Sequence, residues 1–184
     1  MRYLIIILFL ISTSSLAQEL IIENDSLILW QKSRKLTWDD FKGAKQQPKD
    51  VYSMHKIATT AIYFKKRYTQ TQGKPPKLTI SCYFEKYRSW TITDDHKTLE
   101  HEQIHFDIAE LYIRKVRQVF TNLQKKRVLT IKTYMNKVNA LITACGEYQN
   151  TYDDEVLLSY KKQLEWQSKI AKELEKLKEY EYIP

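Results

Sequence analysis

The segment His101-Glu102-Gln103-Ile104-His105 places two histidines four residues apart, with a glutamate directly after the first. Positions four apart share one face of an α-helix, so both imidazoles can bind the same metal ion. Imidazole nitrogen is a common zinc ligand, and the glutamate can take a proton from a zinc-activated water and later pass it to a leaving amine. The spacing therefore indicates a zinc-dependent hydrolase, with His101 and His105 as metal ligands and Glu102 as general base.

A catalytic zinc usually has three protein ligands and one open position, and this motif supplies two of the ligands. The other histidines, His55 and His96, are expected at the surface. Glu110 lies five residues after the second motif histidine, which turns it away from the histidine face. Carboxylates farther along the chain are therefore candidates for the third ligand, namely Asp153, Asp154 and Glu155. Acidic residues are also favoured at a helix start, so this ligand stays open.

The motif lies in a segment with helical periodicity after Trp90. Asp94-Asp95 provide a negatively charged cap, and one stripe along the helix then contains His101, His105, Ile108 and Tyr112. A second helix follows from Ile131 and is expected to end at Gly146 in a C-cap position. A last helix is expected to begin near Asn150–Asp153 and to bury Trp166, Ile170, Leu174 and Leu177.

Two segments before the motif have the pattern of strands. Ile57 to Tyr68 alternates and is rich in β-branched and aromatic residues, and Leu78 to Phe84 alternates in the same way. The turn residues Gly73-Lys74-Pro75-Pro76 separate them, which predicts a β-hairpin with one face in the core. The expected fold is α+β: a small antiparallel hairpin or sheet packed on about three helices, with a zincin-like active-site helix at the centre.

The N-terminus has the features of an export signal. Arg2 precedes an apolar run from Leu4 to Ile11, and small residues around Ala17 provide a cleavage site. The apolar run is too short to span a bilayer. We therefore expect a signal peptide at residues 1–17, a single domain at 18–184, export to the periplasm or the exterior, and no stable membrane span afterwards.

The two cysteines, Cys82 and Cys145, would meet an oxidising compartment after export. A disulfide between them is one expectation. Two buried free thiols are the other, because each cysteine falls on an apolar face. The sequence leaves both open.

The chain has a formal net charge of +8 at pH 7. Its lysines and arginines are expected to be scattered and interleaved with glutamate, as on a solvated helical surface. We find no basic block, glycine-rich phosphate loop or nucleic-acid motif, so nucleic-acid binding is not expected. The expected partner is a peptide or protein substrate.

Three stretches resemble the DUF922 family, exported bacterial proteins that are regarded as zinc-dependent proteases. They are Leu-Thr-Trp-Asp-Asp-Phe-Lys-Gly at 36–43, Ser-Trp at 89–90, and Leu-Glu-His-Glu-Gln-Ile-His-Phe-Asp-Ile-Ala-Glu-Leu-Tyr at 99–112. The resemblance extends from about Leu36 to Trp166. It implies a compact zincin-like fold, one zinc ion, His101 and His105 as its ligands, and Glu102 as the catalytic base.

One departure from the family pattern concerns the third ligand. The pattern has Tyr-Asp, then Thr-x-His-Gly, then Gln and Trp; here Tyr152-Asp153, Gln163 and Trp166 match, but Leu158 stands at the histidine step. Leucine cannot bind zinc, so Glu155 or its neighbour Asp154 substitutes, or metal binding is weakened. The alternative function is a non-catalytic envelope or binding protein that keeps the fold. In an active enzyme, the Tyr152 hydroxyl is the expected donor to the oxyanion.

Overall fold

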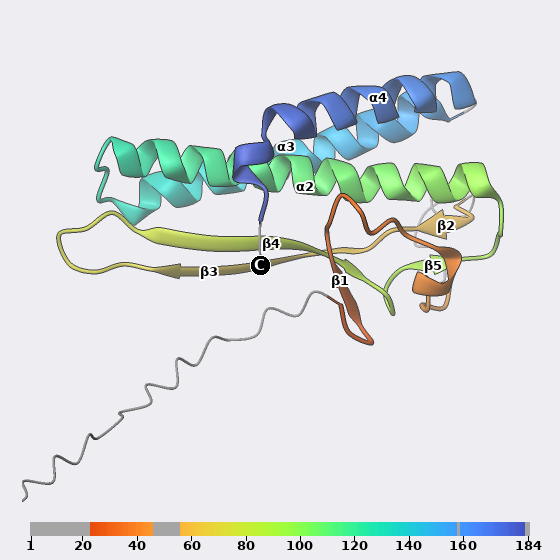
Figure 1. Ribbon diagram of the computed structural model, residues 1–184, viewed down its shortest axis with the longest axis horizontal. Coiled ribbons are helices and arrows are strands. Elements are labelled where there is room, and N and C mark those ends of the chain that lie inside the picture. The colour runs from red at the N-terminus through yellow and green to blue at the C-terminus, as the bar shows by residue number, and fades with distance from the viewer. Residues whose placement is uncertain (1–22, 46–55, 158, 183–184) are drawn as a thin grey trace, which may run out of the picture.

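The computed structural model describes residues 23–45, 56–157 and 159–182. An antiparallel sheet in the order β1–β4–β3 lies against a layer of helices (Figure 1). Its strands are β1 (Leu27–Leu29), β3 (Ile62–Thr69) and β4 (Lys77–Glu85). The helices are α2 (His96–Lys125), α3 (Ile131–Val156) and α4 (Tyr160–Lys176). The predicted α+β class is confirmed for these residues.

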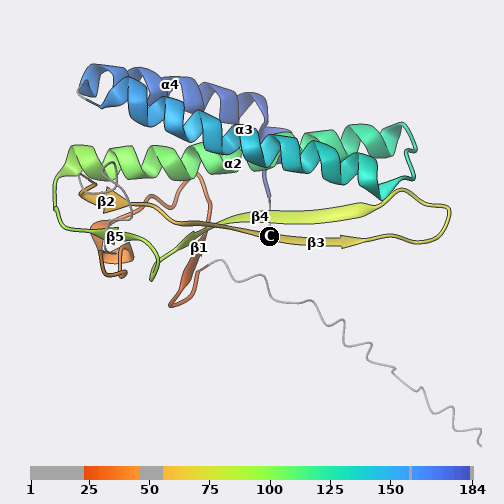
Figure 2. The same ribbon diagram turned by 180° about the vertical axis from the view of Figure 1, so that it is seen from behind.

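Two short strands and two 3-10 turns complete the fold. Strands β2 (Ala58–Thr59) and β5 (Trp90–Thr91) pair with each other. The turns are η1 (Trp38–Asp40) and η2 (Lys178–Tyr180), the second of them near the C-terminus. In both views α2 lies between the sheet and the pair formed by α3 and α4 (Figures 1 and 2).

Helix α2 is buried on several sides because it has the sheet below it and two helices above. Its buried apolar residues therefore extend round the helix and do not form one narrow stripe: Ile104, Phe106, Ile108, Leu111, Ile113, Val116 and Phe120. The helix begins as predicted, with the Asp95 carboxylate accepting a hydrogen bond from the Thr98 amide at 2.8 Å. This central position holds the histidine motif on a rigid element.

The predicted hairpin is confirmed, and the register pairs Ile62 with Phe84 and Thr69 with Lys77. Alternate residues of β4 belong to the core and are almost completely buried, namely Ile80, Cys82 and Phe84. Ser81 and Tyr83 between them are buried as well, so the expectation that only one face of the hairpin is buried does not hold for this part of β4. The first predicted strand is divided in two. Ala58–Thr59 leaves the main sheet to pair with β5, and the Ala61 amide donates to the Ser89 hydroxyl where the two parts separate.

The predicted helix boundaries after Ile131 were wrong. Gly146 lies inside α3, which continues to Val156, and α4 begins only after Ser159, whose hydroxyl caps it. A glycine inside a helix costs about 1 kcal/mol. That cost is offset here because Tyr152 and Val156 extend the buried face of α3 beyond the glycine. The acidic residues at 153–155 therefore end a helix instead of beginning one.

Cys82 and Cys145 are both buried free thiols in the structure. Burial raises the pKa of Cys82 well above its ordinary value and raises that of Cys145 to about 12. Because the thiolate is the reactive form, neither side chain is a nucleophile at neutral pH.

No helix within the described ranges is long and apolar enough to cross a membrane. The predicted signal peptide at 1–17, His55 and Leu158 all lie outside the described residues.

Candidate metal centre

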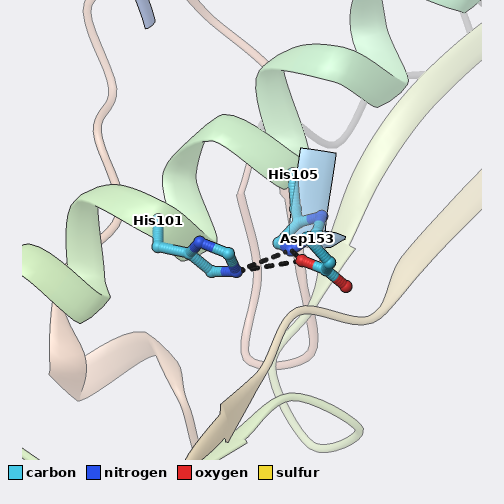
Figure 3. A group of neighbouring side chains, drawn as sticks. All are labelled: His101, His105 and Asp153. Atoms are coloured by element: carbon cyan, nitrogen blue, oxygen red, sulfur yellow. Dashed lines mark hydrogen bonds and ion pairs between the residues drawn. The ribbon is translucent and has the colours of Figure 1, made fainter. Parts of the chain in front are cut away.

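Three side chains converge on one point beside α2 (Figure 3). His101 and His105 come from consecutive turns of α2, and Asp153 comes from the last turns of α3. The Nε2 atoms of the two histidines are 3.0 Å apart. The Oδ1 atom of Asp153 lies 3.2 Å from Nε2 of His101 and 2.8 Å from Nε2 of His105. The structure thus brings together the two predicted histidines and one of the three candidate carboxylates.

Gln149 fixes which nitrogen of His105 faces the cluster. Its amide nitrogen donates to the backbone carbonyl of His105 at 2.9 Å, and a carbonyl can only accept. The other end of the amide, Oε1, therefore faces Nδ1 of the same histidine and accepts a short hydrogen bond from it. With its proton on Nδ1, a neutral His105 presents the lone pair of Nε2 to Asp153 and His101.

The close contact between His105 and Asp153 consequently needs a proton or a cation. Lone pairs on Nε2 of His105 and Oδ1 of Asp153 face each other at 2.8 Å, which is repulsive unless a proton or a cation lies between them. Burial by itself lowers the pKa of His105, but the bond to Asp153 and the charge of Glu102 outweigh it, so the pKa lies above the ordinary histidine value. Burial opposes ionisation of Asp153 too, yet its bonds to both histidines hold its pKa far below the usual range.

A zinc ion fits the spacing of these three atoms. Zinc bonds of about 2.0–2.1 Å in tetrahedral geometry separate neighbouring ligand atoms by about 3.3 Å. The observed separations of 2.8 to 3.2 Å are slightly shorter. Small rotations of partly buried side chains would make up the difference. Two imidazoles and one carboxylate are also a donor set that catalytic zinc sites use.

Glu102 is buried beside the cluster with 4% of its surface exposed. Its Oε2 atom has no hydrogen-bond partner within the described part of the chain. A buried carboxylate oxygen without a donor is costly and uncommon in folded proteins. An acceptor held in this way suits a group that takes up a proton during a reaction. This geometry supports the role of general base predicted for Glu102.

Tyr152 packs against the cluster and is completely buried. Its ring stacks on His101 with centroids 4.7 Å apart and meets His105 edge-on at 5.0 Å. Its hydroxyl lies 3.5 Å from the backbone carbonyl of His101. Burial raises the pKa of Tyr152 strongly, so the phenol stays protonated. These contacts hold the ring of His101 in place. The hydrogen bond from the Tyr152 hydroxyl to an oxyanion stays a prediction.

The remaining candidates lie elsewhere. The Glu155 carboxylate accepts a hydrogen bond from the indole nitrogen of Trp166 at 2.9 Å, and Asp154 is exposed. His96 is exposed and lies 3.4 Å from Glu100. Glu110 points away from the histidines, as expected, into a cluster with two arginines. The third candidate ligand in the structure is therefore Asp153.

Gln149 was not foreseen from the sequence. A signal was nevertheless present, because Gln149 and Asp153 are four residues apart and share one face of a helix. That signal was hidden by the expected helix break at Gly146, which separated Gln149 from the preceding helix.

We expect Gln149→Leu to weaken zinc binding by about 10- to 100-fold, as is typical when the outer partner of a ligating histidine is lost. The change removes the acceptor that holds the proton on Nδ1 of His105. Competition with a chromophoric chelator measures the affinity. Gln149→Glu keeps an acceptor at this position and should retain most of the binding. Asn150→Leu changes an exposed neighbour and serves as the control; equal losses in both leucine variants would contradict the role.

Comparisons of the chain with models of protein families, with curated proteins and with solved structures each find no match. The centre itself carries the chemical indication of function: three converging atoms that could bind a metal, a fixed tautomer of His105 and a buried carboxylate beside them.

Proposed function

We propose that the protein is a zinc-dependent hydrolase that cleaves peptide bonds, the activity that the resemblance to the DUF922 family implies. His101, His105 and Asp153 would hold the ion. Zinc bound there would supply Lewis acidity, which activates water and polarises the substrate carbonyl. The same ion would lie between the facing lone pairs of His105 and Asp153, where a proton or a cation is needed.

The protein's own groups would carry the proton and keep the ligands oriented. Glu102 would accept a proton at Oε2 and return it to the leaving amine, because that atom is buried and has no donor among the described residues. Gln149 keeps Nε2 of His105 directed at the centre. Tyr152 covers the rings of both histidines and limits the entry of bulk water from its side.

The observation that carries the proposal is the position of Asp153. The alternative was a non-catalytic protein that had lost its third ligand. That alternative followed from Leu158, which occupies the position at which the family pattern has a histidine. Asp153 supplies a carboxylate oxygen within 3.2 Å of both histidine nitrogens, so three candidate ligands are present. A complete set of three candidate ligands favours an active enzyme over a non-catalytic protein that only keeps the fold.

Substitution of the general base tests the proposal. We expect the zinc-loaded protein to cleave casein or a cell-wall peptide, and Glu102→Gln to lower kcat by at least about 100-fold while zinc binding persists. The substitution keeps the size of the side chain and removes its ability to take the proton. Chromatographic detection of product gives the rate.

Glu100→Gln is the matched control, since Glu100 lies two residues earlier on the same helix and accepts a hydrogen bond from Tyr160. Its rate should stay within a few-fold of the unmodified protein. Zinc binding without cleavage of either substrate class in the unmodified protein would favour the non-catalytic binding protein instead.

A further inference from the structure

The positive charge of this chain is segregated, contrary to the interleaving expected from the sequence. Residues 56–84 and 111–146 contain no aspartate or glutamate, although both stretches contain many lysines and arginines. Lysine and glutamate do alternate along α4, which is where the expected pattern holds. The excess of positive over negative charge therefore comes from the two acid-free stretches.

The fold brings the turns of these stretches to the same end of the molecule. The β3–β4 turn and the α2–α3 turn lie beside each other in both views (Figures 1 and 2). The side-chain amide of Gln70 donates to the Leu129 carbonyl at 2.7 Å, and that of Gln124 donates to the Pro76 carbonyl at 2.7 Å. These two bonds tie the hairpin to the helical layer.

We call this region the basic end and define it by nine exposed residues: Lys65, Lys66, Lys74, Lys77, Lys125, Lys126, Arg127, Lys132 and Lys137. Within the described chain, no salt bridge to a carboxylate is found for any of them. Neither stretch contains an acidic residue, so the charge that these two stretches contribute is positive. Carboxylates approach from the C-terminal segment, where Glu179 and Glu181 line a hollow with Leu78 and Gln124.

Two exposed apolar side chains lie in the same region. Tyr68 near the end of β3 is 58% exposed, and Leu129 in the helix–helix turn is 47% exposed. Tyrosine and leucine surrounded by lysines are the residue types that enter the boundary between lipid headgroups and acyl chains. The long apolar stems of lysine also allow the charged group to reach outward while the stem contacts lipid.

We propose that the basic end docks the protein on an anionic lipid surface. Eight of its nine charges are lysines, which act as flexible, hydrated point charges, whereas a nucleic-acid site favours the planar fork of arginine. Lys74, Lys126 and Arg127 lie in the two turns, and the other six charges lie on the strands and helices that lead into these turns. The two turns are at one extremity of the molecule, which suits contact with a flat surface (Figure 1). Each lysine near an anionic bilayer contributes about 1 kcal/mol, so a few suffice for reversible binding.

Docking in this way would orient the candidate metal centre. His101 lies near the first turn of α2 and Lys125 at its last residue, a separation of about 36 Å at 1.5 Å per residue. The centre would therefore face away from the lipid, toward substrates in the surrounding space. The docking does not depend on the proposed hydrolase activity and can be tested without metal.

Co-sedimentation with vesicles tests the proposal. We expect the protein to bind phosphatidylcholine vesicles that contain one third phosphatidylglycerol, to ignore pure phosphatidylcholine vesicles, and to dissociate as salt is added. The combined change Lys74→Glu, Lys77→Glu and Lys126→Glu should weaken binding by at least about tenfold, because three attractive charges become repulsive.

The matched control reverses three lysines of α4: Lys161→Glu, Lys172→Glu and Lys176→Glu. It changes the net charge by the same amount and should bind almost normally. Equal losses in both triple variants would show that only net charge matters and would overturn the proposal. So would equal binding to both vesicle types, or tighter binding to a short DNA duplex than to the anionic vesicles. Circular dichroism confirms that each variant is folded.

Discussion

Replacing Asp153 with alanine is expected to weaken zinc binding by more than about 100-fold, a larger loss than removal of an outer hydrogen-bond partner causes. The reason is twofold: the change deletes one of the three proposed ligand atoms, and it removes the negative charge that both histidines face at 3.2 Å or less. Chelator competition gives the affinity, and the absorption spectrum of the cobalt-substituted protein reports the number of ligands.

The neighbouring acidic residues provide the controls. Asp154→Ala removes the same side chain one position later, where it is exposed, and should leave the zinc affinity within about twofold. Glu155→Ala should lose only the hydrogen bond with Trp166, which affects the end of α3 and not the metal. If Glu155→Ala abolished zinc binding and Asp153→Ala did not, the assignment of the third ligand would be wrong.

Local spacing made two of the three residues of the candidate metal centre predictable. His101 and His105 share a helix face because four residues make about one turn, so their convergence needs no knowledge of the rest of the fold. The position of the third proposed ligand, Asp153, depends on how α3 packs against α2. The boundary expected at Gly146 placed Asp153 at the start of a helix, where an acidic residue has an independent explanation. Tertiary burial of Tyr152 overrode that local signal.

The same contrast holds for the rest of the molecule. The hairpin and the start of α2 were predictable because alternation, turn residues and a capping aspartate are local signals. The small β2–β5 pair was not, because it joins residues that are about thirty positions apart. The acid-free stretches were visible in the sequence, but only the packing of two turns combines them into one basic end.

A second large effect is expected away from the candidate metal centre, in a buried charge cluster on the same helix. Glu110 accepts hydrogen bonds from Arg114 at 3.1 Å and from Arg117 at 2.8 Å. Arg114 also donates to the Leu174 carbonyl and pairs with Glu181 at 2.8 Å. Arg117 donates to the carbonyls of Ile80 and Tyr180, so the cluster ties α2 to the sheet, to α4 and to the C-terminal segment.

Glu110→Ala is therefore expected to lower the free energy of unfolding by about 3–5 kcal/mol, because it leaves buried guanidinium groups without their shared carboxylate. The side chains of Glu110 and Arg114 are each only 2% exposed, so water cannot replace the lost partner. Urea unfolding at neutral pH measures the change. In a double-mutant cycle with Arg114→Met, the combined loss should be clearly smaller than the sum of the single losses.

The surface pair of Lys162 and Glu165 is the reference, since both side chains are about half exposed. Lys162→Ala should cost less than about 1 kcal/mol. A loss that small for Glu110→Ala would mean that the cluster is solvated and not buried. The zinc affinity of the folded Glu110→Ala protein should stay normal, because this carboxylate lies on another face of α2 from the histidines. Stability and metal binding can thus be altered separately on a single helix, by Glu110 in one case and by Asp153 in the other.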